Sequence, residues 1–348
     1  MNTDTTGNGA AESRFNGLAV FAGIAVTVAL GVAIGANVMF ERSLKTTVAP
    51  PAVQAAKAAP AAAAPASTPA SAAQASPATR AMVVSTVFSP PPEASMPGGD
   101  YGKVVRLGEQ VFMQTGKYAS RYVGNDLNCA SCHLDAGRKP DSAPMWASFI
   151  HYPAFRSKTG KVDTLAARIQ GCFQFSMNGK APPEDDEIMT ALQTYAFWLA
   201  KGAPVGTPVP GSGYPKLKKP AQPADYARGE KVYAQNCALC HGADGLGQRA
   251  GDHQVFPPLW GSRSFNWGAG MHQLGNAAGF IQANMPLGKG GTLSEQDAWD
   301  VAVFMNSHER PQDPRFLGTV EATRQKYHDD PTDSLYGSRV NGHVLGSP

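Results

Sequence analysis

The sequence lacks a strong excess of charge of either sign. Only 16 % of its 348 residues are Asp, Glu, Lys or Arg, and the formal net charge is +3. An Ala- and Pro-rich tract near the N-terminus accounts for part of this low charge. Proteins that bind nucleic acid through its phosphates usually show a basic excess. We therefore expect no nucleic-acid partner.

Cysteine is also scarce, with five in the whole chain. Four of them form two Cys-x-x-Cys-His motifs, at Cys129-Ala130-Ser131-Cys132-His133 and Cys237-Ala238-Leu239-Cys240-His241. A thioredoxin-like dithiol needs a βαβ context, which the sequence lacks, and a zinc site built from both cysteine pairs would leave the two histidines unexplained.

Cys-x-x-Cys-His is the attachment signature of a c-type haem, whose vinyl groups form thioethers with the two thiols. The adjacent histidine is then the proximal iron ligand. We therefore predict two covalently bound c-type haems. The expected attachment residues are Cys129, Cys132, Cys237 and Cys240, and the expected proximal ligands are His133 and His241.

An uncharged apolar run covers residues 17–40. It exceeds the roughly 18–20 residues that span a bilayer, and a cleavable signal would have a shorter apolar core. We predict an uncleaved transmembrane anchor after a cytoplasmic segment, residues 1–16. Residues 41–82 are predicted to form a disordered Ala/Pro-rich spacer. Because c-type haem is attached outside the bacterial cytoplasmic membrane, the rest of the chain is expected to be periplasmic.

The remaining sequence repeats one plan. A helical pattern with the same Gly-Glu-x-Val beginning, at Gly108 and at Gly229, precedes each haem motif. An amphipathic helix closes each repeat, over residues 184–201 and 294–306, and Ser294 is the expected N-cap of the second. This order resembles a class I cytochrome c domain, in which the first and last helices cross.

We therefore predict a mainly α fold with two class I cytochrome c-like domains in tandem, preceded by the anchor and the spacer. The predicted segments are domain 1 (83–204), a Pro/Gly-rich linker (205–220), domain 2 (221–311) and a polar, loop-like C-terminal tail (312–348). Domain 1 also carries an insertion, residues 115–128, before its haem motif. Long loops in compact domains are often functional, so this one is expected beside the site.

A six-coordinate haem needs a second axial ligand. In domain 2 the expected ligand is Met285, in an Asn-Met-Pro-Leu-Gly loop, with Met271 and Met305 as rivals. Thioether ligation raises the potential, which suits the haem from which electrons leave. In domain 1 both Cys172 and Met177 are candidates, and the residues alone do not decide between them. Weaker distal candidates are His151, His253 and His272.

Cys172 is the one cysteine outside the haem motifs. An unpaired cysteine in an oxidising compartment needs a reason to be there. Ligation to iron would supply one and would stabilise the thiolate form. The alternative is that Cys172 is a small buried apolar side chain.

The segment Arg168-Ile-Gln-Gly-Cys-Phe-Gln-Phe-Ser-Met-Asn-Gly179 resembles the di-haem thiosulfate dehydrogenases, as do the Met-Pro-x-Gly loop and the ending at residues 306–311. The resemblance covers about residues 95–320. It implies oxidation of two thiosulfates to tetrathionate, in some members reversed, with electrons passing from haem 1 to haem 2 and then to a cytochrome or oxidase.

The resemblance also implies that Cys172 is the distal thiolate ligand of haem 1, that Met177 is packing, and that Met285 is the distal ligand of haem 2. The sequence departs from the family at two positions. Asn284 stands where some members have a lysine that exchanges with the methionine ligand, and Phe175 stands where a polar or basic residue is expected.

Thiosulfate is a dianion, so a site that joins two of them needs fixed cations. Arg168 is four residues before Cys172 and would share its helix face. Arg156 and Lys158 precede it, and Ser176 could donate to the same oxyanion. Arg168 could instead pair with a haem propionate, and Ser176 could cap a turn.

Two other functions fit the same motifs. A tethered di-haem electron carrier that feeds a terminal oxidase needs no thiolate-ligated haem beside arginines. A di-haem peroxidase is the weaker alternative, because nothing in the sequence resembles its peroxide site.

Overall fold

The computed structural model describes residues 87–251 and 253–347. In that part of the chain no helix has both the length and the apolar character needed to span a bilayer. The predicted cytoplasmic segment, the anchor and the whole spacer lie outside the described residues. The membrane anchor therefore stays a prediction.

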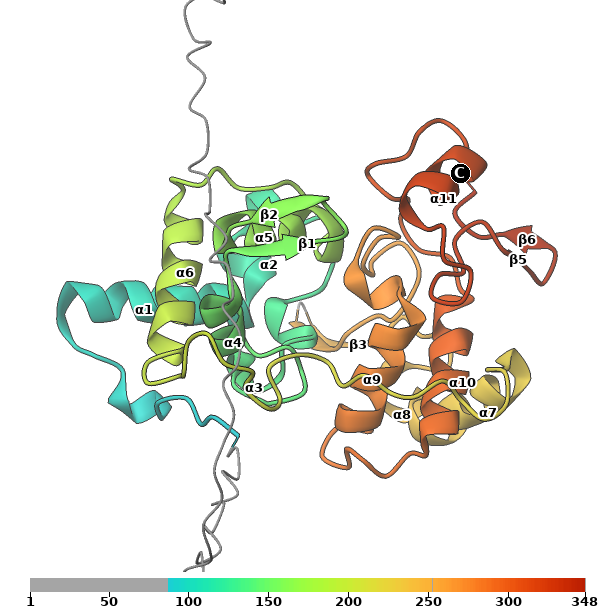
Figure 1. Cartoon of the computed structure of the whole chain (residues 1–348), viewed down its shortest axis with the longest axis horizontal. Coiled ribbons are helices and arrows are strands. Elements are labelled where there is room, and N and C mark those ends of the chain that lie inside the picture. The colour runs from blue at the N-terminus through green and yellow to red at the C-terminus, as the bar shows by residue number, and fades with distance from the viewer. Residues whose placement is uncertain (1–86, 252, 348) are drawn as a thin grey trace, which may run out of the picture. The chain divides into compact units, whose positions relative to one another are not determined.

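The described chain is mainly helical, with three short antiparallel hairpins (Figure 1). The elements before the linker are η1 (Glu93–Ser95), α1 (Gly99–Met113), α2 (Thr115–Tyr118), η2 (Ser120–Tyr122), η3 (Cys129–Ser131), α3 (Leu134–Gly137), α4 (Met145–His151), β1 (Ala154–Arg156), β2 (Lys161–Asp163), α5 (Leu165–Gly171), the π-helix η4 (Cys172–Ser176) and α6 (Glu187–Leu199). Those after it are α7 (Tyr226–Asn236), α8 (Ala238–His241), β3 (Gln248–Ala250), β4 (His253–Phe256), η5 (Gly270–His272), α9 (Leu274–Asn284), α10 (Glu295–Asn306), α11 (Val320–Tyr327), β5 (Arg339–Val340) and β6 (His343–Val344).

In domain 1, α1 crosses α6, as the class I cytochrome c plan requires (Figure 1). The crossing depends on a glycine, because a Cβ at Gly108 would lie 2.2 Å from the carbonyl oxygen of Ala191. Beside it, Phe112 packs on Tyr195 with ring centroids 5.9 Å apart, and both side chains are buried. The contact thus combines one close backbone approach with an aromatic pair.

Domain 2 repeats this contact between α7 and α10. A Cβ at Gly229 would lie 2.1 Å from the carbonyl oxygen of Asp300, and the rings of Tyr233 and Phe304 are 5.2 Å apart. Ser294 caps α10 by accepting a hydrogen bond from the Asp297 amide, 3.0 Å. The prediction of a mainly helical fold with cytochrome c domains is confirmed.

The helix crossing in domain 1 gives a first prediction. Gly108→Ala is expected to lower the free energy of unfolding by about 1–3 kcal/mol, because the added methyl group overpacks a backbone contact. Gly116→Ala is the matched control, since a Cβ there has nothing within 4 Å. Urea unfolding of the haem-loaded protein measures both. Equal midpoints for the two variants would contradict the proposed close contact.

The C-terminal segment is not the loop that the sequence suggested. It contains α11, capped by the Thr319 side chain, and the β5–β6 hairpin. A small core of its own joins Val320, Tyr336 and Leu345 to Trp267 of domain 2. The sequence pattern missed this segment because its apolar residues are few and one of their partners lies far away in the chain.

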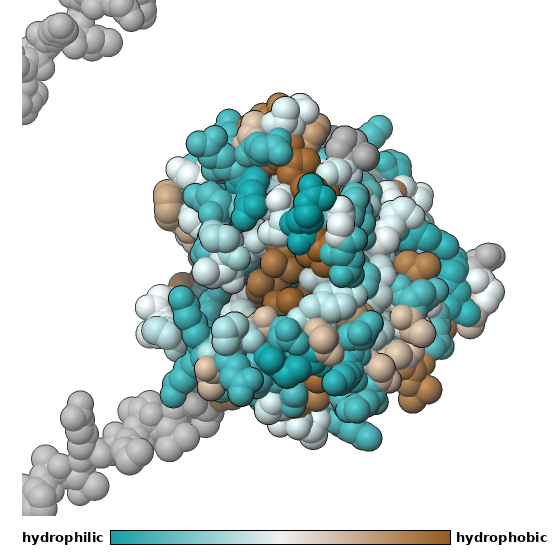
Figure 2. All heavy atoms as spheres, turned by 90° about the vertical axis from the view of Figure 1, so that its right-hand side faces the viewer, coloured by the Kyte–Doolittle hydropathy of each residue, from teal (hydrophilic) through white to brown (hydrophobic). Residues whose placement is uncertain are grey.

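The apolar residues of the described chain are mostly inside. The face in Figure 2 is largely hydrophilic, and its apolar residues gather mainly in a hollow near the centre. Two separate hydrophobic clusters, one for each cytochrome domain, form the interior. Each cluster borders the cavity that contains the haem motif of its domain.

Candidate functional site

The first cavity lies in domain 1 and brings together the residues that the sequence singled out. Cys129, Cys132 and His133 line it, and Cys172 and Ser176 line it too. Three cysteine sulfurs and an imidazole therefore share one largely apolar space.

His133 is oriented by its backbone surroundings. Its Nδ1 is hydrogen-bonded to the carbonyl oxygen of Ala143, 2.6 Å away. His241 in domain 2 makes the same type of bond, from Nδ1 to the carbonyl oxygen of Pro257, 2.9 Å. Burial lowers the pKa of His241 and so favours the neutral ring. A hydrogen bond at one ring nitrogen fixes the tautomer and leaves the other free to bind a metal.

Cys172 begins the π-helix η4, directly after α5. The Nη1 atom of Arg168 lies 2.7 Å from the Cys172 sulfur, one helical turn earlier in the chain. Burial acts against ionisation of this thiol, but the charge of Arg168 and a hydrogen bond from His133 outweigh it and lower its pKa to about 6. This thiol is therefore set up to be a thiolate.

The two attachment cysteines of the same cavity behave in the opposite way. Burial raises the pKa of Cys129 and of Cys132 to about 12. Of the three cysteines in this cavity, only Cys172 has an arginine against its sulfur. The alternative that Cys172 is simply a small apolar residue does not account for this ion pair.

Met177, the rival ligand, also lines the first cavity. Its side chain is 3 % exposed and belongs to the domain 1 core. Its backbone amide donates to the carbonyl oxygen of Cys172, 2.9 Å, and closes the π-turn. These contacts favour a packing role for Met177.

The other predicted cations lie further from the cavity. Arg156 is at the end of β1, and its charge contributes to the lowered pKa of Cys172. The Lys158 amine lies 3.8 Å from the Phe175 ring centroid and donates to the carbonyl oxygen of Gly268. Burial and then the nearby Arg315 charge lower the pKa of Lys158 to about 7. Among the described residues neither Arg156 nor Lys158 lines the first cavity.

Arg315 is a further cation near Phe175, and the sequence did not indicate it. Its guanidinium lies 5.0 Å from the Phe175 ring centroid, and its side chain pairs with Asp313 at 2.6 Å. Phe175, where a polar or basic residue was expected, thus contacts Lys158 and Arg315. No sequence signal could have found Arg315, since it belongs to the segment taken as a loop-like tail.

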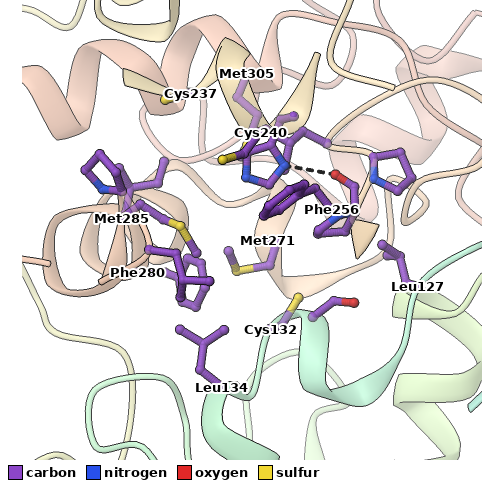
Figure 3. A pocket seen from close by; sticks show the side chains of 18 of the residues that line it. Leu127, Cys132, Leu134, Cys237, Cys240, Phe256, Met271, Phe280, Met285 and Met305 are labelled. Carbon is purple, nitrogen blue, oxygen red and sulfur yellow. Dashed lines mark hydrogen bonds between the residues drawn. The ribbon is translucent and has the colours of Figure 1, made fainter. Parts of the chain in front are cut away.

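The second cavity lies in domain 2 and contains the other motif (Figure 3). Cys237, Cys240 and His241 line it, and Met285 follows directly after α9. The two rivals of Met285, Met271 and Met305, line the same cavity. The sulfur expected to bind the iron is thus present, but the cavity offers four thioethers, since Met113 of α1 lines it too.

Asn284, beside Met285, is held in place. Its Nδ2 donates to the carbonyl oxygen of Asp141 in domain 1, 2.9 Å, and to that of Phe280, 3.0 Å. The side chain is 1 % exposed. The amide of Asn284 has no amine that could exchange with the Met285 thioether as a ligand.

The two cavities adjoin each other. Leu127, Asn128, Cys132 and Met271 line both of them. Met271 also packs against the hydrophobic cores of both domains. From the sequence, Met271 was only a rival ligand of Met285. Its position between the two cavities is a result of the fold.

The residues fit c-type haem in both cavities. Each cavity is predominantly apolar and offers two thiols, a histidine whose Nδ1 is bonded to a backbone carbonyl, and a further sulfur. Within residues 87–251 and 253–347, no three His, Cys, Asp or Glu side chains converge as a metal cage. The zinc alternative therefore has no support there.

Two of the three histidine rivals have other surroundings, whereas the side chain of the third, His253, lies outside what the structure describes. His272 is buried, 3.2 Å from the Ser334 hydroxyl through its Nδ1 and against the His328 ring. It is absent from the described lining of either cavity. His151 ends α4 and is exposed. These positions favour sulfur ligands over histidine.

The second cavity gives a prediction for Met285. Met285→Leu is expected to abolish the long-wavelength absorption band of methionine-ligated ferric haem and to lower the midpoint potential of that haem, because the thioether is lost. Met305→Leu is the control, as Met305 is a buried residue of α10 in the same cavity. Loss of the band in Met305→Leu alone would reverse the assignment.

Comparison with known proteins gives a family match for each domain. Residues 118–205 match the family described as SoxA/TsdA, cytochrome c domain, and residues 224–305 match cytochrome c oxidase, cbb3-type, subunit III. Both matches are cytochrome c families and include or directly follow a haem motif. They support covalently bound c-type haem in this chain.

The relatives found are named for one activity. A thiosulfate dehydrogenase of Stutzerimonas stutzeri (strain A1501) is 54 % identical over 260 residues, which cover 74 % of this chain and 85 % of the relative. A thiosulfate dehydrogenase of Thiomonas intermedia (strain K12) is 56 % identical over 259 residues, 74 % of this chain and 82 % of the relative.

A solved structure agrees with these relatives. The thiosulfate dehydrogenase TsdBA from Marichromatium purpuratum matches with a TM-score of 0.73 and 50 % identity, over 78 % of this chain. The match spans 60 % of the TsdBA chain. By the identity and coverage of its relatives, this chain belongs to the family of di-haem thiosulfate dehydrogenases.

Proposed function

We propose that this protein is a thiosulfate dehydrogenase that joins two thiosulfates into tetrathionate and releases two electrons to a cytochrome or oxidase acceptor. The observation that carries the proposal is the pair formed by the Cys172 sulfur and the Arg168 guanidinium, 2.7 Å apart, in the cavity of the first haem motif. A plain electron carrier has no need of such a pair. The family membership of the chain supports the same activity.

Two haems are part of the proposal. In the first cavity Cys129 and Cys132 would attach the group, and His133 and Cys172 would bind its iron. In the second cavity the same roles fall to Cys237, Cys240, His241 and Met285. When bound, c-type haems supply one-electron oxidation and reduction.

The protein has to overcome repulsion between two dianions. Arg168 is the cation nearest to Cys172, and its guanidinium can hold a sulfonate-like oxyanion with two parallel donors. Ser176 lines the same cavity and can donate one further hydrogen bond. Arg156, and Lys158 in its protonated form, add positive charge behind them, which favours an anion at the cavity.

We assign the bond-forming step to Cys172. The thiolate and the terminal sulfur of one thiosulfate form a sulfur–sulfur bond, and two electrons leave toward the acceptor. The sulfane sulfur of the second thiosulfate then attacks the adduct sulfur that is bonded to Cys172. The bond to Cys172 breaks, so tetrathionate forms and the thiolate is regenerated. Arg168 balances the charge of the thiolate at the start and at the end of the cycle. In the alternative, Cys172 only tunes the iron.

The site of action follows from the haem chemistry and the N-terminal sequence. We propose a periplasmic protein attached to the cytoplasmic membrane through residues 17–40, with the Ala/Pro-rich spacer between the membrane and the cytochrome domains. Its acceptor would be a soluble cytochrome c or a membrane oxidase.

A steady-state assay with thiosulfate, repeated with tetrathionate and a reduced electron donor, tests the proposal. Electron paramagnetic resonance of the oxidised protein is recorded on the same sample. We expect turnover in at least one direction together with a low-spin histidine/thiolate signal. Two histidine/methionine signals without turnover would instead identify an electron carrier.

A further inference from the structure

The π-helix η4 leaves several of its carbonyl groups without a partner in its own helix. Its closing bond runs from the Met177 amide to the Cys172 carbonyl, 2.9 Å, and the Phe173 carbonyl accepts from the Gly179 amide, 2.9 Å. π-Turns are rare and occur frequently at functional sites. The Phe175 carbonyl accepts from the Asn178 amide, 3.3 Å. Buried carbonyls need hydrogen bonds, and those of Gln174 and Ser176 receive theirs from outside the turn.

Domain 2 supplies most of these groups through one residue, Asn266. Its Nδ2 donates to the Gln174 carbonyl, 3.0 Å, and its backbone amide donates to the Phe175 carbonyl, 3.3 Å. Asn125 of the inserted segment donates to the Ser176 carbonyl, 2.8 Å, and with the same Nδ2 to the Ser264 carbonyl, 3.1 Å. Asn125 thus connects the segment that carries Cys172 to Ser264, two residues before Asn266.

All polar groups of the Asn266 side chain are used. The second hydrogen bond of Nδ2 goes to Oδ1 of Asn178, 3.0 Å, and Oδ1 of Asn266 accepts from the Gly268 amide, 3.0 Å. Asn178 has a positive φ of 46°, and it ends the π-turn. Asn266 is completely buried. A buried amide with all its hydrogen bonds made holds the segments that it joins in one geometry.

The same two segments meet around Phe175. The Phe175 ring would collide with a Cβ at Gly268, 2.4 Å away. Lys158 covers Phe175 and donates to the Gly268 carbonyl. The contact between the Cys172 segment and the Asn266 segment is therefore packed as well as hydrogen-bonded.

We propose that Asn266 of domain 2 is a positioning residue for Cys172 of domain 1: its amide fixes the π-turn that presents the sulfur to the first cavity. Domain 2 then has two tasks, since it contains its own haem site and also completes the catalytic segment of its neighbour. The inference rests on the proposed ligand role of Cys172.

The sharpest test is Asn266→Asp, which keeps the shape and replaces the Nδ2 donor by an acceptor. The carboxylate oxygen would then face the Gln174 carbonyl, and the π-turn can relieve that repulsion only by moving. We expect a fraction of the first haem to lose its histidine/thiolate signal in electron paramagnetic resonance, and kcat for thiosulfate to fall by about tenfold or more. The methionine-ligated band of the second haem should remain.

Asn276→Asp is the matched control, because Asn276 donates only within domain 2, to the Gly270 carbonyl and to Gln273. It should retain both spectra and the wild-type kcat. If Asn266→Asp does not accumulate, Asn125→Asp tests the same turn at the Ser176 carbonyl from a half-buried position, and the thiolate signal should again weaken.

The outcomes separate the inference from the function on which it rests. A wild-type protein without any histidine/thiolate signal would refute the ligand role of Cys172. A wild-type protein with this signal, unchanged in both Asn266→Asp and Asn125→Asp, would refute only the positioning role of Asn266.

Discussion

Replacement of Cys172 by alanine or by methionine is expected to reduce tetrathionate formation by about 1,000-fold or more, because the step assigned to the thiolate has no other nucleophile in the cavity. Alanine removes the sulfur, whereas methionine keeps a sulfur that can bind iron but cannot form a bond to substrate. Both variants should still carry two haems per chain, as measured by the haem content of the denatured protein, since Cys129 and Cys132 are untouched.

The matched control for Cys172 is Met177→Leu. Met177 lines the same cavity and is buried in the domain 1 core. Leucine conserves its volume, so the cost in stability should stay below about 1.5 kcal/mol. We expect this variant to keep the histidine/thiolate signal and most of the turnover. Appreciable tetrathionate formation by Cys172→Ala or Cys172→Met would refute both roles proposed for Cys172, as bond-forming thiolate and as ligand that tunes the iron.

The second large effect is expected at Arg168. Arg168→Met removes a charge-assisted hydrogen bond to a buried sulfur, and such bonds are worth up to about 3 kcal/mol. Transition-state stabilisation of that size corresponds to about a 100-fold loss in kcat/KM for thiosulfate. Arg168→Lys should lie between this variant and the wild type, because an ammonium keeps the charge but not the paired donors.

Arg106 supplies the control for Arg168. It lies in α1, and its Nη1 atom donates to the Pro97 carbonyl, 3.0 Å, at an exposed position. Arg106→Met should therefore leave the kinetics unchanged. If Arg168→Met altered only the potential of the first haem and left the KM for thiosulfate as it was, Arg168 would be a partner of the haem propionates and not a substrate-binding residue.

The elements with strong local signals were predictable. The Cys-x-x-Cys-His motifs specify haem attachment by covalent chemistry, which needs only adjacent residues. The helix that Ser294 caps begins at Glu295, as expected, because the cap is a contact between neighbours in the chain. The arrangement of Arg168 and Cys172 on one helical turn followed from their spacing, and the distance of 2.7 Å between the guanidinium and the sulfur fits it.

Other features needed the fold. The C-terminal segment was expected to be loop-like, yet it is folded against Trp267. It also places Arg315 against the Phe175 ring. Phe175 looked out of place in the sequence, and its partners, Lys158 and Arg315, come from both sides of it in the chain. A single residue that packs against a distant partner leaves no period in the sequence, so no pattern could reveal these contacts.

By itself the sequence determined the haem chemistry, the two-domain plan and the family, because these depend on covalent motifs and on helical periodicity. Only the tertiary structure decided how the two sites relate. It brings the cavities together at Met271 and holds the Cys172 turn through Asn266. These contacts join residues almost a hundred positions apart, for which burial and hydrogen-bond geometry, and not local preference, select the partner.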